Sequence, residues 1–210
     1  ERVLAGLHWE TLLVYLDDVI VFAKSVEEEL SRLETVFQRL RASGLKLKPK
    51  KCHLFRRSVL YLGHVVSDEG IGTDPDKIRA VQEWPTPKTV RDVQSFLGLA
   101  SYYRRFIKNF ADIARPLHGL TEKAKEFIWS DACENAFQEL KMRLQQSPIL
   151  AYPVAEADYI LDTDASGEGI GAVLSQIVEG HERVIAYASK ALSKAERNYC
   201  VTRRELLAVV

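Results

Sequence analysis

Two short apolar runs, residues 12–16 and 19–22, are separated only by Asp17 and Asp18. Both runs are rich in strand-forming residues and aspartate is common in turns, so they predict a hairpin with Asp17–Asp18 as its two-residue turn. Taken alone, the aspartate pair fits an ordinary turn. It equally fits a divalent-metal site, because carboxylate oxygens are hard ligands for Mg²⁺.

Helical spacing of apolar residues follows. Ser25 with Glu28 forms a capping-box pattern, and the apolar spacing continues to Gly44, which predicts a helix over residues 26–43. A second apolar run at residues 59–66, turning at residues 67–70, suggests another hairpin.

Further helix starts lie in the middle of the chain. Asp74 followed by Pro75 has the N-cap and first-turn proline of a helix, and Thr89 caps the next segment. Ser130 begins another helix, which ends before Pro148.

The pattern then returns to strands. Residues 159–163, 170–176 and 184–189 are strand candidates joined by short turns, and Thr202 with Glu205 forms a capping box that opens a last helix. The sequence therefore predicts an α/β (α+β) fold.

Composition excludes several classes of protein. The chain has 210 residues, of which 47% are hydrophobic and 28% charged, so it is globular rather than disordered and fits one large or two small domains. Its longest apolar runs are five residues, whereas a membrane-spanning helix needs about 20. Three widely spaced cysteines predict neither a disulfide framework nor a zinc site, and fit a reducing, intracellular compartment. Because the first residue is Glu1 and not Met, we expect a fragment of a longer polyprotein.

Charge is unevenly distributed although 29 basic and 29 acidic residues cancel. Residues 36–66 hold eight Lys or Arg and no Asp or Glu, whereas residues 126–170 hold nine acidic residues against two basic ones. A basic zone of this kind suits a polyanion track or a solvated face.

Asp164 and Glu205 are further candidates for chemistry. Asp164 ends a predicted strand and shares a face with Asp162, because side chains alternate along strands. A strand-end turn and a capping box explain Asp164 and Glu205 equally well without catalysis.

A series of motifs now decides between these readings. Tyr15-Leu-Asp-Asp18 resembles the metal-binding hairpin of reverse transcriptases, and Tyr61-Leu-Gly-His64-Val-Val-Ser67 resembles their primer-grip hairpin. Later motifs resemble the thumb and the start of the ribonuclease H domain of gypsy-type long-terminal-repeat retrotransposon Pol polyproteins: Pro75-Asp-Lys-Ile78, Trp84-Pro-Thr-Pro87, Phe96-Leu-Gly-Leu99, Tyr102-Tyr-Arg-Arg-Phe-Ile107, Thr163-Asp-Ala-Ser166, Gly171-Ala-Val-Leu174 and Glu205-Leu206. The motifs follow the family's order over nearly the whole chain.

The resemblance implies a role for each matched residue. Asp17 and Asp18 would be two of three metal-binding carboxylates of an RNA-directed DNA polymerase. Asp164 and Glu205 would be the first two carboxylates of a ribonuclease H site, with two Mg²⁺ at each site. Contacts with the primer–template end would come from these residues: Tyr15, Leu16, Leu62, Gly63 and His64.

The resemblance also divides the chain and names its partners. Residues 1–73 would be the end of the palm, residues 74–125 the thumb, and residues 126–210 the first part of a ribonuclease H-like domain. The implied partners are an RNA/DNA primer–template, an RNA–DNA hybrid and deoxynucleoside triphosphates, with no membrane; the oligomeric state stays open. The implied location is cytoplasmic retroelement particles, with nuclear access for the DNA product.

Arg104, Arg105 and Lys108 recur at i, i+1 and i+4, so we expect one helical face that meets the phosphate backbone of the duplex. Because each site would lack ligands, we expect the 210-residue chain alone to be inactive in both reactions. The alternative is a degenerate or domesticated retroelement remnant that binds nucleic acid without chemistry.

Overall fold

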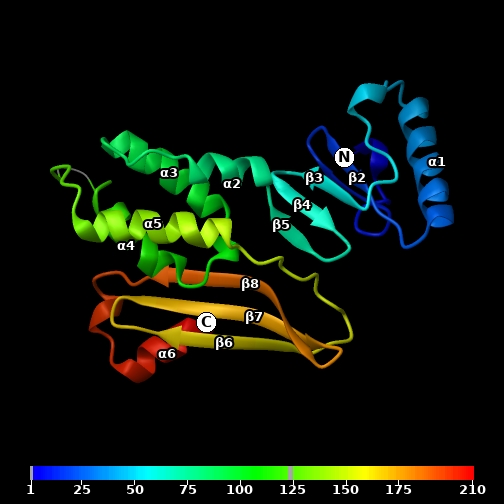
Figure 1. Ribbon diagram of the computed structural model, residues 1–210. Coiled ribbons are helices and arrows are strands. Elements are labelled where there is room, and N and C mark those ends of the chain that lie inside the picture. Colours follow the sequence, from blue (N-terminus) through cyan, green and yellow to red (C-terminus); the bar gives the residue numbers. More distant parts are fainter. Residues whose placement is uncertain (1, 123–124) are drawn as a thin grey trace. The chain divides into compact units, whose positions relative to one another are not determined.

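Helices and antiparallel strands alternate along the chain in the computed structural model, which describes residues 2–122 and 125–210 (Figure 1). The chain divides into two units, Glu1–Asp68 and Glu69–Val210. The mixed α/β class expected from the sequence is confirmed.

The first unit is built from two hairpins and one long helix. Its elements are η1 (Arg2–Leu4), β1 (Leu12–Tyr15), β2 (Asp18–Val21), α1 (Val26–Ala42), η2 (Pro49–Lys51), β3 (Ser58–Tyr61) and β4 (His64–Ser67). A small core joins η1, β1 and α1 through Leu4, Leu12 and Val36, each of which is buried.

The first hairpin turns one residue earlier than predicted. Tyr15 pairs with Asp18, so the turn is Leu16–Asp17 and Asp18 is the first residue of β2. Leu16 has a φ of 51°, a conformation that a leucine rarely adopts, which is why the sequence pattern did not predict it.

The second hairpin bends inside the apolar run of residues 59–66, while β4 ends at Ser67 and β5 begins at Ile71, on either side of the turn predicted at residues 67–70. Tyr61 pairs with His64, and the intervening Leu62 and Gly63 have φ values of 48° and 67°. Positive φ at both central residues is the geometry of a type I′ turn, whose twist matches that of the two strands.

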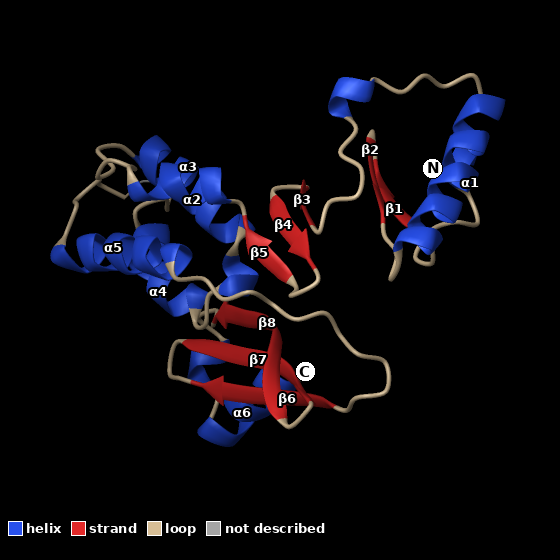
Figure 2. Ribbon diagram, turned by 45° about the vertical axis from the view of Figure 1, so that its right-hand side comes forward, coloured by secondary structure: helices blue, strands red, loops and turns tan. Residues whose placement is uncertain are grey.

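The second unit contains the remaining elements, drawn in Figure 2 as a helical group and a three-stranded sheet. They are β5 (Ile71–Thr73), α2 (Pro75–Gln82), α3 (Val90–Tyr102), η3 (Arg104–Phe106), α4 (Phe110–Gly119), α5 (Asp131–Gln145), β6 (Tyr159–Ala165), β7 (Gly169–Val178), β8 (His181–Ala191), η4 (Glu196–Asn198) and α6 (Val201–Val209).

Capping side chains set most helix starts where the sequence indicates them. The hydroxyl of Ser25 accepts a hydrogen bond from the Glu28 amide, and Thr89 with Asp92 completes a capping box. The predicted box at Thr202 is wrong: α6 begins at Val201 with Cys200 as N-cap, so Thr202 lies inside the helix. A helix start two residues earlier places Thr202 in the first turn, where its side chain is not at the N-cap position.

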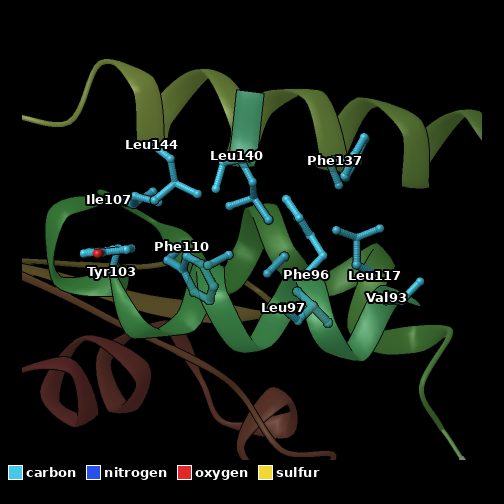
Figure 3. Packing of buried hydrophobic residues seen from close by; sticks show 14 of the residues in the cluster. Val93, Phe96, Leu97, Tyr103, Ile107, Phe110, Leu117, Phe137, Leu140 and Leu144 are labelled. Carbon is cyan, nitrogen blue, oxygen red and sulfur yellow. The ribbon is translucent and has the colours of Figure 1, made fainter. Parts of the chain in front are cut away.

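The main core fills the space between α3, α4 and α5. Figure 3 shows Phe137 and Leu140 of α5 directed toward Phe96 and Leu117 on the facing helices, and Leu144 beside Ile107. The rings of Phe96 and Phe137 meet edge to face, with their centroids 4.7 Å apart. Burial of these large side chains supplies most of the packing energy of the helical group.

The sheet has strand order β6-β7-β8, and all its pairings are antiparallel. Helix α6 packs against β6 and β7, while α4 contacts β8 (Figure 1). The buried amide of Gln176 on β7 accepts from the Val154 amide and donates to the carbonyls of Val154 and Ala157, which ties the preceding loop to the sheet.

Within the described residues, no helix is long and apolar enough to cross a membrane.

Candidate functional site

The tip of the first hairpin presents two carboxylates to solvent. Asp17 lies in the turn and Asp18 opens β2, and both side chains are exposed. Tyr15 and Leu16 flank them and are 56% and 79% exposed. Exposed apolar and aromatic groups beside a carboxylate pair form a surface that can contact a ligand as well as a cation.

Electrostatics connect this tip with the second hairpin of the same unit. Burial, and secondarily the negative charge of Asp18, raise the pKa of the Tyr61 phenol. Tyr61 stands directly before the Leu62–Gly63 turn. The first residue after this turn is His64, whose Nδ1 lies 2.9 Å from the Leu62 carbonyl oxygen. Two motifs more than forty residues apart in the sequence therefore influence each other within one unit.

The second pair of candidate carboxylates comes from β6 and α6. Asp164 pairs with Gly171 in the sheet, and its side chain is exposed, as is that of Glu205 on α6. Because α6 packs against β6, the two elements that hold these carboxylates are neighbours. Asp162 precedes Asp164 by one strand repeat and is also exposed.

The donor chemistry of both pairs fits a hard divalent cation, since each consists of carboxylates at an accessible position. In the part of the chain that the structure describes, however, no three His, Cys, Asp or Glu side chains gather closely enough to hold a metal ion. Within these residues, each pair could supply only part of the ligand set of a metal ion.

The expected helical face of Arg104, Arg105 and Lys108 is wrong. Helix α3 ends at Tyr102, Arg104 and Arg105 lie in η3, and Lys108 follows in the loop before α4. The helix stops because this segment docks on the sheet: the Arg104 guanidinium donates to the Ser189 carbonyl of β8. Arg104, Arg105 and Lys108 are all exposed, so the three side chains differ in their contacts and not in their burial class.

Several contacts hold α4 on the same sheet. The Ser189 hydroxyl accepts from the Ala111 amide at 2.9 Å, and Arg115 forms an ion pair with Glu168 in the β6–β7 turn. The helical group and the sheet are therefore joined by specific polar contacts as well as by apolar packing.

Arg204 is a residue that the sequence reasoning missed. Its Nη1 donates to the Ser166 carbonyl at 3.0 Å, from the helix that holds Glu205 to the turn that follows Asp164. Its position next to Glu205 was the available signal, but only the fold reveals its partner.

Comparison with protein families separates the two ends of the chain. Residues 1–66 match the family described as reverse transcriptase (RNA-dependent DNA polymerase), and residues 129–210 match the RNase H-like domain found in reverse transcriptase. The Pol polyprotein of the Drosophila melanogaster transposon gypsy is 42% identical over 209 residues, which cover 94% of this chain. The chain belongs to the gypsy-type Pol family.

Other Pol polyproteins have similar sequences. The one from the D. melanogaster transposon 412 is 40% identical over 205 residues, and the Schizosaccharomyces pombe transposon Tf2-3 polyprotein is 30% identical over 200 residues. These matches cover 98% and 95% of this Pol chain. The chain spans only 20% of the gypsy polyprotein and 17% of the 412 polyprotein.

Solved structures of foamy viral protease-reverse transcriptase have the same fold as this Pol chain. One in complex with double-stranded DNA has a TM-score of 0.87 with 26% identity, and one in complex with an RNA/DNA hybrid has a TM-score of 0.85 with 26% identity. Both cover 99% of this chain, which corresponds to 36% and 28% of the respective viral chains.

Proposed function

We propose that this Pol chain is part of an enzyme that synthesises DNA on an RNA or DNA template and cuts the RNA strand of RNA–DNA hybrids. The observation that carries the proposal is the exposed Asp17–Asp18 pair on a hairpin tip within the reverse transcriptase match. In this proposal residues 1–73 are the end of the palm, residues 74–125 the thumb, and residues 126–210 part of the ribonuclease H-like domain.

Asp17 and Asp18 would hold Mg²⁺ at the polymerase site, together with ligands from outside this pair. When bound, the metal ions stabilise the attacking and leaving oxygens of phosphoryl transfer. The chain's own residues do the positioning: Tyr15 and Leu16 lie beside the carboxylates, where they would contact the primer–template end and the incoming deoxynucleoside triphosphate. The turn of Leu62, Gly63 and His64 would hold the primer terminus.

Asp164 and Glu205 would serve the nuclease site in the same way, each as an oxygen ligand for Mg²⁺. Their support is the RNase H-like match together with the packing of α6 on β6. The complexes of the foamy viral enzymes with double-stranded DNA and with an RNA/DNA hybrid support nucleic-acid duplexes as the substrates.

The test uses the full-length Pol polyprotein that contains this segment. Asp17→Asn should abolish Mg²⁺-dependent primer extension and leave duplex binding intact, because the substitution removes a metal ligand but keeps the side-chain size. Asp68→Asn is the matched control, since Asp68 is an exposed carboxylate of the same unit outside the hairpin tip. Unchanged extension by the Asp17→Asn protein would overturn the polymerase assignment.

A second substitution pair tests the nuclease site. Asp164→Asn should abolish cleavage of the RNA strand in a hybrid, whereas Asp162→Asn, one strand repeat earlier, should retain it. Equal loss from both variants would show that Asp164 has no special role. If the unmodified polyprotein binds a duplex but shows neither primer extension nor RNA cleavage, the alternative of a remnant that only binds nucleic acid is favoured.

A further inference from the structure

A small cavity of about 110 Å³ lies where the end of α5 meets the segment between η3 and α4. It belongs entirely to the second unit and contains none of the four candidate catalytic carboxylates. Its lining combines cationic, neutral polar and apolar side chains, chiefly Lys108, Arg143, Gln146, Tyr187, Phe106 and Ile107.

The charges that line this cavity are both positive. Lys108 is exposed and forms no ion pair within the described residues. Arg143 is paired with Glu139 on the preceding helical turn, but only its Nε takes part, at 2.8 Å from the carboxylate oxygen. The two terminal nitrogens of its guanidinium stay available for another acceptor.

The dipole of α5 disfavours an anion in this cavity, but it is weaker than the two positive charges. The cavity lies at the C-terminus of α5, whose dipole corresponds to roughly half a negative charge. The two full positive charges of Lys108 and Arg143 still exceed this partial charge and the single negative charge of Glu139 together, and Glu139 occupies only one edge of the guanidinium. The net preference of the cavity is therefore for an anion.

The floor of the cavity is rigid. Phe106 and Ile107 are 2% and 1% exposed and belong to the main core, against which Tyr187 also packs. The phenol of Tyr187 and the amide of Gln146 add neutral groups that can donate hydrogen bonds. An anion would enter a site whose walls are already in place, so little ordering free energy opposes binding.

We propose that this cavity binds one phosphate group of the backbone of a nucleic-acid duplex. A volume of about 110 Å³ is enough for a single small anion. The planar guanidinium of Arg143 matches the oxygens of a phosphate, and Lys108 adds a point charge. The proposal rests on the proposed function only for the source of the phosphate, because the cavity itself is defined by charge and shape.

The first experiment probes the cavity with inorganic phosphate alone. In ¹H–¹⁵N spectra of the 210-residue chain, phosphate should shift the amide signals of Lys108 and Gln146. Arg143→Gln should weaken this binding about tenfold, the loss expected for one charge-assisted hydrogen-bonded contact. Arg91→Gln on α3, where the arginine is exposed and outside the cavity, should leave it unchanged.

Glu139→Gln gives a prediction of opposite sign. It removes the carboxylate that competes for Arg143 and keeps both cations, so phosphate should bind more tightly than to the unmodified chain. Because Arg143 and Glu139 are 48% and 34% exposed, both variants should fold, which thermal unfolding by circular dichroism checks. Absence of phosphate-dependent shifts, or equal affinity in all three variants, would overturn the proposal.

The second experiment identifies the source of the phosphate with a labelled RNA–DNA hybrid duplex. The logarithm of affinity is plotted against the logarithm of salt concentration. For Arg143→Gln, the magnitude of the slope should fall by about one, which is the contribution of a single phosphate contact. An unchanged slope with retained binding of inorganic phosphate would overturn the backbone assignment and leave free phosphate as the ligand. If the full-length polyprotein binds no duplex, the nucleic-acid function proposed above fails, while the phosphate titration still decides whether the cavity binds anions.

Discussion

The guanidinium of Arg204 on α6 donates through Nη1 to the carbonyl oxygen of Ser166, at 3.0 Å. Ser166 follows Asp164 by two residues, and Arg204 directly precedes Glu205. The turn at Ser166 is itself ordered, because its hydroxyl accepts from the Gly169 amide at 2.8 Å. One hydrogen bond thus links the two segments that hold the proposed nuclease carboxylates.

We expect Arg204→Ala to loosen α6 from the β6–β7 turn. The substitution removes a charged donor from an exposed carbonyl that water can then solvate, which should lower the free energy of unfolding by about 0.5–1.5 kcal/mol. Hydrogen exchange of α6 amides should accelerate more than that of α3 amides. Arg204→Lys should recover part of the protection, and protection equal to the unmodified chain in Arg204→Ala would contradict the linking role.

Gly169 and Gly171 permit the close approach of α4 to the sheet. A Cβ atom at Gly169 would lie 2.4 Å from Asp112 Oδ1, and one at Gly171 would lie 2.7 Å from Asn109 Oδ1. Gly169→Ala should therefore destabilise the second unit by about 1–3 kcal/mol, because the Asp112 side chain must move. Urea unfolding of the single variants and of Gly169→Ala with Asp112→Ala measures the effect. If the clash is the cause, the double variant should recover most of the loss; purely additive losses would argue against it.

The two neighbouring arginines of η3 should respond differently to substitution. Arg104 is bound to the Ser189 carbonyl, so Arg104→Ala should lower the melting temperature. Arg105 is exposed and has no such partner among the described residues, so Arg105→Ala should leave stability unchanged and reduce the salt dependence of duplex binding. If Arg104→Ala instead reduced the salt dependence of duplex binding and Arg105→Ala lowered the melting temperature, Arg104 and not Arg105 would contact the phosphate backbone.

Tyr103 should make the protein sensitive to alkaline pH. Burial, ahead of the nearby Asp74 and Tyr102, raises the pKa of its phenol to about 12. The unfolded chain loses this proton near pH 10, its ordinary pKa. Between pH 10 and about 12 the folded state binds more protons, so stability is full below pH 10 and falls as the pH rises. Tyr103→Phe should reduce this fall, measured as the difference between the two proteins in chemical unfolding; parallel curves would contradict the assignment.

Local sequence signals predicted the helices and strands well. Ser25, Asp74, Thr89 and Ser130 each cap a helix through the side chain, as expected, because a cap depends on residues only two or three positions away. The strand candidates after residue 157 are confirmed as β6, β7 and β8, each longer than predicted.

Features that depend on distant partners were not predictable in this way. Periodicity extended a helical face through Arg104, but the contact of Arg104 with Ser189, 85 residues later in the chain, ends the helix there. No pattern of neighbouring residues predicts the positive φ of Leu16. None predicts that Lys108 and Arg143 line the same cavity. The sequence by itself determined the elements and the family, because caps, periods and motifs are properties of neighbouring residues. Only the tertiary structure decided which of these cations binds the sheet, because that contact joins segments that are far apart in the sequence.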